Sequence, residues 1–259
     1  MTHIVPAILP KDFQEILAKL ELVKGAVDSV QIDIVDGKFA PNKTWPYIGD
    51  HGEITNIVNE QEGFPFWKDF DFEFDLMVVK PEEAVPFWVR AGASRVIVHI
   101  ESTPPDTLSD IIKEWKHAVD IGLALKPSTP LEKLETFLHE VSFVQCMGND
   151  RISFGGVPLD ERVVLPKIAH LRKKYPELTI SVDIGVSLET APRLIEAGAS
   201  RLVAGSAVFG KANPAGAVRE LERLFTLHAE FPDSFAAGMN AGRVGRGSGK
   251  REFPRGGKQ

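Results

Sequence analysis

The feature that most constrains this chain is a regular alternation of short apolar segments with amphipathic segments of helical period. Eight segments have the length and apolar content of buried strands: 3–8, 29–35, 71–79, 95–101, 121–126, 142–147, 178–184 and 201–205. Between them, apolar residues recur at three- and four-residue spacing, as in Phe13, Ile16, Leu17 and Leu20. Eight successive strand–helix units in 259 residues predict an α/β fold, a single (β/α)8 TIM barrel.

Local signals agree with these boundaries. Pro81, Pro130 and Pro214 stand where first helical turns are expected. The alternative α/β architecture, a doubly wound sheet, usually carries a glycine-rich nucleotide fingerprint after its first strand, and this chain has none. We therefore expect no nucleotide cofactor. The connection 38–70 is long and rich in Pro and Gly, and we expect it to cover the active face.

The charge distribution separates the barrel from a tail. We expect the barrel to occupy residues 1–231 and a mobile, Gly/Arg-rich tail to occupy 232–259. From Gly238 onward six basic residues stand against one acid, although the whole chain has a net charge of −6. The acidic body argues against nucleic acid as the main partner, and one Arg-Gly-Gly at 255–257 is weak evidence for it.

The remaining composition indicates the compartment. No apolar run approaches the roughly 18 residues that span a bilayer, and the N-terminus has no signal-peptide pattern. Cys146 is the single cysteine, which excludes an internal disulfide and a Cys-rich zinc site. We expect a soluble cytoplasmic protein with no membrane partner, and a homo-oligomer.

Polar residues are concentrated where the strands end. In a barrel these C-terminal ends converge on one site, and here they carry Gln31, Asp33, Asp75, His99, Glu101, Lys126 and Asp183. One Asp at a strand end is often a turn cap. Three of them, on different strands, indicate catalysis or metal binding instead. For His99 and Glu101, a structural pair and a pocket-shaping role both stay open.

A second set of strand ends is rich in glycine. Backbone N–H groups can approach a phosphate at such positions, and barrels often bind phosphate beyond strands seven and eight. The residues are Gly155, Gly156, Gly185, Val186, Gly205 and Ser206. Ordinary turn glycines are the competing interpretation. No Walker-type Lys is present, so a nucleotide γ-phosphate is not expected.

Several motifs in the correct order resemble the ribulose-phosphate 3-epimerases. Gln31-Ile-Asp-Ile-Val-Asp-Gly-Lys-Phe-Ala-Pro-Asn42 resembles the first signature of that family, His-x-Asp-x-Met-Asp-Gly-x-Phe-Val-Pro-Asn. The likeness continues through Phe74-Asp-Leu-Met77, Val98-His-Ile-Glu101, Leu125-Lys-Pro-Ser-Thr-Pro130, Val182-Asp-Ile-Gly185 and Val203-Ala-Gly-Ser-Ala-Val-Phe-Gly210. It covers most of residues 3–225 and leaves the tail outside.

The resemblance implies an isomerase that inverts C3 of a ketopentose 5-phosphate, converting D-ribulose 5-phosphate to D-xylulose 5-phosphate. It implies that Asp33 and Asp183 exchange protons with opposite faces of C3 through an enediolate, next to a divalent metal. It also implies that Met77 and Met147 cover this intermediate, although ordinary barrel filling explains two methionines as well.

The departures from the family pattern fall in the metal site and the substrate loops. The two metal-binding His positions are Gln31 and Asp75, and a substrate-contacting Ser is Ala7. The signature Met is Val35. The usual Asn-Pro-Gly-Phe-Gly-Gly loop is the longer Asn149-Asp-Arg-Ile-Ser-Phe-Gly-Gly156.

These replacements change the expected metal. Gln31, Asp33, Asp75 and Asp183 form an oxygen-only set, which suits Mg²⁺, Mn²⁺ or Ca²⁺ better than Zn²⁺. Three adjacent carboxylates repel one another, so we expect either such an ion or Lys126 as the counter-charge.

Three functions are compatible with the sequence. The favoured one is a sugar-phosphate epimerase with an altered metal site. The others are a related barrel enzyme acting on a different phosphorylated sugar, such as an aldolase, a decarboxylase or another epimerase, and a non-catalytic sugar-phosphate-binding protein.

Overall fold

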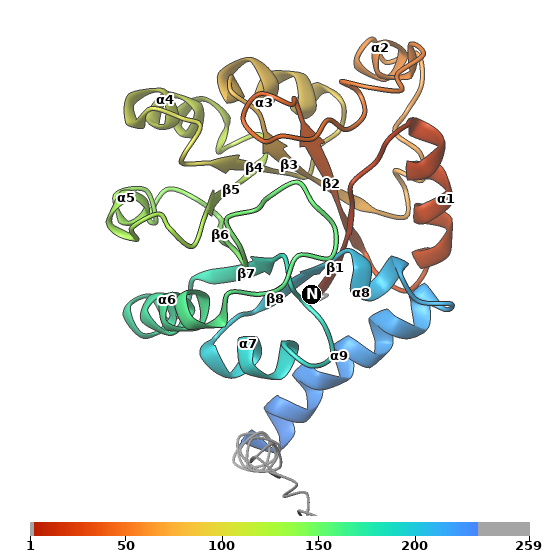
Figure 1. The fold of residues 1–259 in the computed structure, drawn as a ribbon. Coiled ribbons are helices and arrows are strands. Elements are labelled where there is room, and N and C mark those ends of the chain that lie inside the picture. Colours follow the sequence, from red (N-terminus) through yellow and green to blue (C-terminus); the bar gives the residue numbers. More distant parts are fainter. Residues whose placement is uncertain (1–2, 233–259) are drawn as a thin grey trace, which may run out of the picture.

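Eight parallel strands form a closed barrel in chain order, which confirms the predicted (β/α)8 fold (Figure 1). The computed structural model describes residues 3–232. The strands are β1 (Ile4–Ile8), β2 (Ser29–Val35), β3 (Asp71–Met77), β4 (Arg95–His99), β5 (Asp120–Leu125), β6 (Phe143–Met147), β7 (Thr179–Asp183) and β8 (Arg201–Ala204). The predicted tail, apart from its first residue, lies outside the described part.

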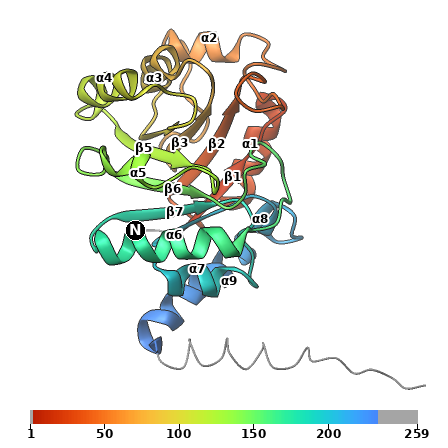
Figure 2. The same cartoon turned by 60° about the vertical axis from the view of Figure 1, so that its left-hand side comes forward.

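Helices surround the barrel, and Figure 2 shows α6, α7 and α9 together on one side of it. The helices are α1 (Phe13–Val23), α2 (Glu53–Val58), α3 (Pro81–Arg90), α4 (Pro105–Trp115), α5 (Glu132–Glu135), α6 (Glu161–Lys174), α7 (Ala191–Ala197), α8 (Ser206–Phe209) and α9 (Pro214–Glu230). Pro81 and Pro214 are the first residues of their helices, as predicted. None of the helices in residues 3–232 is long and apolar enough to cross a bilayer.

One element was not predicted. The connection 38–70, which the sequence indicated to be irregular, contains the short helix α2. Asp50 starts it, because its Oδ1 accepts a hydrogen bond from the Ile54 backbone N–H at 3.2 Å. Gly52, immediately before the helix, has a φ of 106°, which only glycine adopts without strain.

The two faces of the barrel strands have different chemistry. The outward faces are apolar and pack beneath the helices, as do Val30, Ile32 and Ile34 of β2. The inward faces alternate with them. They combine apolar residues such as Val35 and Met77 with buried polar ones, which are Gln31, Asp33, Glu73, Asp75, His99, Gln145, Ser181, Asp183 and Arg201.

An ion pair lies near the N-terminal end of the barrel interior. The Arg201 guanidinium on β8 donates to the Glu73 carboxylate on β3, and its other nitrogen donates to Ser181 Oγ at 3.2 Å. Both charged side chains are less than a tenth exposed. This pair thus neutralises charge at the N-terminal end of the barrel, while at the opposite end Asp33 and Asp183 line a cavity.

Candidate active site

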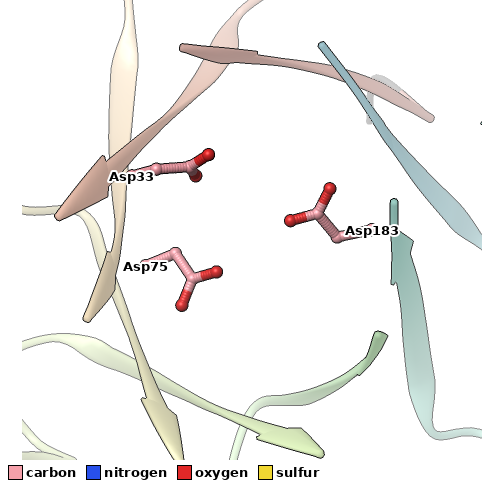
Figure 3. A group of neighbouring side chains, drawn as sticks. All are labelled: Asp33, Asp75 and Asp183. Atoms are coloured by element: carbon pink, nitrogen blue, oxygen red, sulfur yellow. The ribbon is translucent and has the colours of Figure 1, made fainter. Parts of the chain in front are cut away.

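Three aspartates meet inside the barrel near the C-terminal ends of the strands. Asp33 on β2 and Asp75 on β3 are register partners, and Asp183 on β7 faces them across the interior (Figure 3). One carboxylate oxygen from each lies within 4.8 Å of the others. All three side chains are buried. The predicted convergence of residues 42 to 150 positions apart in the sequence is thus observed.

Gln31 connects two of these carboxylates. Its Nε2 donates to Asp33 Oδ1 at 2.8 Å and to Asp183 Oδ2 at 3.2 Å. Its other amide atom, Oε1, is buried and has no hydrogen-bond partner. The amide nitrogen thus bridges the two acids that the sequence predicted to transfer protons.

The pKa values of both bridged acids are raised above their ordinary values. Burial, followed by the negative charges of Asp183 and Asp75, raises the pKa of Asp33 well above its ordinary value. Burial and the charge of Asp75 raise the pKa of Asp183 to about 7. Gln31 opposes both shifts because it donates to the ionised forms.

His99 supplies the counter-charge. Its Nε2 lies 2.9 Å from Asp75 Oδ1, and both side chains are fully buried. Burial lowers the pKa of His99, but the charge and hydrogen bond of Asp75 outweigh this and raise it to about 9. Lys126, the alternative counter-charge from the sequence, instead has its Nζ 4.7 Å from the centre of the Phe39 ring.

Glu101 lies on the other side of His99. Its Oε2 is 3.7 Å from His99 Nδ1, and its Oε1 accepts from the Lys126 backbone N–H and from Thr129 Oγ1 at 2.7 and 2.5 Å. Burial raises the pKa of Glu101, but the nearby His99 side chain and the hydrogen bonds from Lys126 and Thr129 outweigh it and lower the pKa to about 2. His99 thus lies between Glu101 and Asp75 and connects the pair to the site.

Gln145 is a site residue that sequence reasoning missed. Its Nε2 donates to Asp75 Oδ2 at 3.4 Å, and the side chain is fully buried. A signal existed in the sequence, because strand alternation places Gln145 on the same face as Met147. A lone buried Gln in an apolar strand is costly unless it has a partner inside the barrel.

A pocket that opens to solvent lies beside Asp33 and Asp183. Its wall includes Asp33, Asp183 and all eight residues predicted to contact substrate or phosphate: Met77, Met147, Gly155, Gly156, Gly185, Val186, Gly205 and Ser206. The wall also includes Ala7, at the position where the resemblance implies a substrate-contacting Ser, and six residues that were not among the predicted contacts: Leu9, Ser153, Phe154, Val157, Ile184 and Val203. Gln31 and Asp75 are not among the lining residues.

The backbone beyond β7 holds Asp183 in place. The Ile184 backbone N–H donates to Asp183 Oδ1 at 2.7 Å, and Ile184 has a φ of 75°, unusual for a β-branched residue. Gly148 follows β6 and donates its N–H to the Asp183 carbonyl at 2.5 Å. A Cβ on Gly148 would lie 1.9 Å from the Ile184 carbonyl oxygen. The close approach of these two strand ends therefore requires glycine.

The donor atoms at this site fit a hard divalent cation. Three carboxylate oxygens lie close enough together to share one ion. Gln31 carries a further oxygen of the kind that Mg²⁺, Mn²⁺ and Ca²⁺ bind, Oε1, which is buried without a hydrogen-bond partner among residues 3–232, although Nε2 is the amide atom that faces Asp33 and Asp183. No thiolate contributes, since Cys146 is buried in the apolar core.

Comparison with known proteins agrees with the sequence motifs. Residues 3–209 match the model of the ribulose-phosphate 3 epimerase family. The chain is 35% identical to a ribulose-phosphate 3-epimerase of Bacillus subtilis (strain 168), over 85% of this chain and 98% of that protein. It is 33% identical to the enzyme of the same name from Schizosaccharomyces pombe, over 82% and 88%.

A solved structure supports the fold alone. The crystal structure of 3-hexulose-6-phosphate synthase from Salmonella typhimurium matches with a TM-score of 0.64 and 18% identity, over 87% of this chain and 99% of that one. At this identity the likeness extends to the barrel and not to its chemistry.

Proposed function

The chain belongs to the ribulose-phosphate 3-epimerase family, and we propose that it interconverts D-ribulose 5-phosphate and D-xylulose 5-phosphate by proton transfer at C3. The observation that carries this proposal is the pair Asp33 and Asp183, which face each other across the barrel and share the Gln31 amide. Epimerisation needs one base and one acid on opposite faces of a single carbon.

The chemistry of the ketose defines the steps. The C3–H bond is acidic because C3 neighbours the C2 carbonyl. The ionised aspartate takes the C3 proton, the C–H electrons form the C2–C3 double bond of an enediolate, and negative charge develops on the C2 oxygen. The protonated aspartate on the other side then delivers its proton to the opposite face of C3, which inverts the centre.

The pKa shifts of the two aspartates suit proton transfer to and from C3. The pKa of Asp183, raised to about 7, lets this residue take up and release a proton near neutral pH, and the pKa of Asp33 is raised in the same direction. After one turnover the acid and the base have exchanged roles. Gln31 Nε2 donates to both carboxylates, so it stabilises whichever of them is ionised.

We also propose the ligands for the metal that the family resemblance implies. Asp33, Asp75, Asp183 and Gln31 Oε1 would hold a hard divalent ion, Mg²⁺, Mn²⁺ or Ca²⁺ in preference to Zn²⁺. When bound, such an ion supplies positive charge that stabilises the oxygens of the enediolate. Metal analysis of the purified protein and calorimetric titration with Mg²⁺ and Mn²⁺ test this assignment, and absence of binding in both would contradict it.

The remaining parts of the cavity suggest how substrate is held. Gly155, Gly156, Gly185 and Gly205 offer backbone N–H groups for the phosphate, with Val186 and Ser206 beside them. Met77 and Met147 form an apolar wall next to the reacting carbon and exclude water from it. A cytoplasmic location and a homo-oligomeric state stay predictions, and light scattering tests the latter.

Proton exchange at C3 tests the proposed reaction. In D₂O the enzyme should incorporate deuterium at C3 of D-ribulose 5-phosphate, followed by NMR. Asp33→Asn and Asp183→Asn should each lower the rate by roughly 10²- to 10⁴-fold, the range typical of general acid–base groups. Asp110→Asn on α4, where the aspartate is exposed, is the matched control and should exchange at the normal rate.

A different phosphorylated sugar is the second candidate substrate. It is favoured by Ala7, which places a methyl group in the cavity wall, by Val35 and by the longer loop 149–156. Exchange that is slow with D-ribulose 5-phosphate but fast with another ketose phosphate would establish this alternative. Binding of sugar phosphates without any exchange would instead indicate a non-catalytic protein.

A further inference from the structure

The segment between β6 and α6 carries a buried hydroxyl with no hydrogen-bond partner. Ser153 is 5% exposed, and its Oγ is both buried and unpaired. Unpaired buried hydroxyls are uncommon because each forfeits the hydrogen bonds it had with water. Ser153 is also one of the residues that line the cavity beside Asp33 and Asp183.

The backbone of Ser153 is held in an unfavourable conformation. Its φ is 66°, in the left-handed region where a residue with a Cβ pays a steric cost. Two neighbours keep it there. Asn42 Nδ2 donates to the Ser153 carbonyl oxygen at 2.6 Å, and Ile152 packs into the apolar layer that contains Met77 and Met147.

The rest of the cavity wall has few polar side chains. Within residues 3–232, Ser153 and Ser206 are the only lining residues with polar side chains besides the two aspartates, and the others are apolar or glycine. A ketose phosphate carries several hydroxyl groups and a carbonyl. Those that become buried need partners, since an unpaired polar group on the ligand costs as much as one on the protein.

Position within the cavity separates the two serines. Ser206 follows Gly205 at the end of β8, among the groups proposed for the phosphate. Ser153 lies between Ile152, which packs with Met77 and Met147, and Phe154, which precedes the glycines proposed for the phosphate. We propose that the Ser153 hydroxyl hydrogen-bonds an oxygen of the sugar chain, not of the phosphate, and thereby contributes to substrate specificity. This inference rests on the proposed function for the identity of the sugar.

Two substitutions test the hydroxyl separately from the backbone. Ser153→Gly removes the hydroxyl and relieves the positive φ, whereas Ser153→Ala removes the hydroxyl and keeps the strain. Both should lower kcat/KM for D-ribulose 5-phosphate by about tenfold, as expected for one lost hydrogen bond. The melting temperature of the Gly variant should equal or exceed that of the unmodified protein, so unfolding cannot account for its loss of activity.

A control and a binding experiment complete the test. Ser142→Ala removes an exposed hydroxyl before β6, at the opposite end of the barrel, and should leave kcat/KM unchanged. In calorimetry, both Ser153 variants should bind D-ribulose 5-phosphate about tenfold more weakly and inorganic phosphate as tightly as before. An equal loss for inorganic phosphate would move the contact to the phosphate and overturn the assignment.

The binding experiment also separates this inference from the proposed function. If the unmodified protein binds D-ribulose 5-phosphate but does not exchange its C3 proton, the proposed reaction fails while the affinities still test Ser153. If both variants bind and turn over D-ribulose 5-phosphate as the unmodified protein does, the proposed contact between Ser153 and the sugar is wrong. That conclusion does not depend on which reaction the protein catalyses.

Discussion

At the scale of single residues, the site depends on one amide. Gln31 occupies a position where the family resemblance leads one to expect an imidazole, and its Nε2 reaches both Asp33 and Asp183. A hydrogen bond to a carboxylate stabilises the ionised form. Here it only partly offsets burial and the neighbouring charges, so the pKa values of both acids stay raised.

The raised pKa of Asp183 makes stability depend on pH. Folding raises the pKa of Asp183 from 3.8 to about 7, so the folded state favours the protonated acid. Its contribution to stability is therefore complete below the unfolded pKa and is lost as the pH rises through about 7. In EDTA, Asp183→Asn should therefore unfold at higher denaturant than the unmodified protein at pH 8. The gain is on the order of 2–4 kcal/mol and should shrink toward pH 4.

Denaturant unfolding at several pH values measures this difference, and Asp110→Asn provides the control for a surface charge. If the unfolding free energies of Asp183→Asn and the unmodified protein changed with pH in parallel, ionisation of the Asp183 carboxylate would not destabilise the fold.

The same residue predicts a change in metal preference. Gln31→His introduces an imidazole beside Asp33 and Asp183, and Zn²⁺ favours imidazole more than Mn²⁺ does. The ratio of Zn²⁺ to Mn²⁺ affinity, measured by competition calorimetry, should rise by roughly tenfold or more. Because most sites bind Zn²⁺ more tightly than Mn²⁺ in absolute terms, the informative quantity is the change in this ratio. No change would argue against Gln31 as a ligand position.

At the scale of elements, the site requires β6 and β7 to end in close contact. Gly148 after β6 lies against the backbone of Ile184 after β7, and both segments border the cavity. On this side of the cavity, backbone contact between the ends of β6 and β7 sets the distance between the two strands, and side chains contribute little to it.

Gly148→Ala should disrupt this contact. The added methyl group would lie 1.9 Å from the Ile184 carbonyl oxygen, so the two strand ends must separate and carry Asp183 with them. We expect a loss of about 2–4 kcal/mol in unfolding free energy and a lower C3 exchange rate. Gly155→Ala, with open space around its Cβ, should leave the unfolding free energy unchanged. Equal stability of the two variants would contradict this account.

At the scale of the whole molecule, the barrel interior combines apolar clusters with buried polar and charged residues. The Glu73–Arg201 pair lies near the N-terminal end, and the aspartates with Gln31, His99 and Gln145 lie above it. Most barrel interiors are filled by branched apolar residues. In this chain, stability therefore depends on keeping the Glu73 carboxylate paired with Arg201.

Arg201→Met should therefore be strongly destabilising. It leaves the fully buried Glu73 carboxylate with Arg95, 3.6 Å away, as its remaining cationic neighbour. Removing one partner of a buried ion pair costs about 3–5 kcal/mol, which lowers Tm by roughly 10 °C in a chain of this size. Calorimetry measures the loss. The double variant Glu73→Leu/Arg201→Met should recover much of it, and equal losses in the single and double variants would contradict pairing as the cause.

Much of the architecture could be predicted because local sequence patterns determine it. All eight strands were placed within a few residues, and barrel closure then brings Asp33 and Asp183 to the same end of the molecule. The helix α2 was missed because its six residues show little periodicity, and it depends on Asp50 and Gly52 at its start.

What the sequence by itself determined is the barrel, the family, and the convergence of three aspartates with a glycine-rich cavity wall. Strand alternation and chain topology are sufficient for these. Only the tertiary structure decided that Gln31 bridges Asp33 and Asp183, that His99 and not Lys126 pairs with Asp75, and that Ser153 is buried without a partner. These facts depend on distances across the barrel between residues far apart in the chain, which follow from strand register and loop packing and have no local signature.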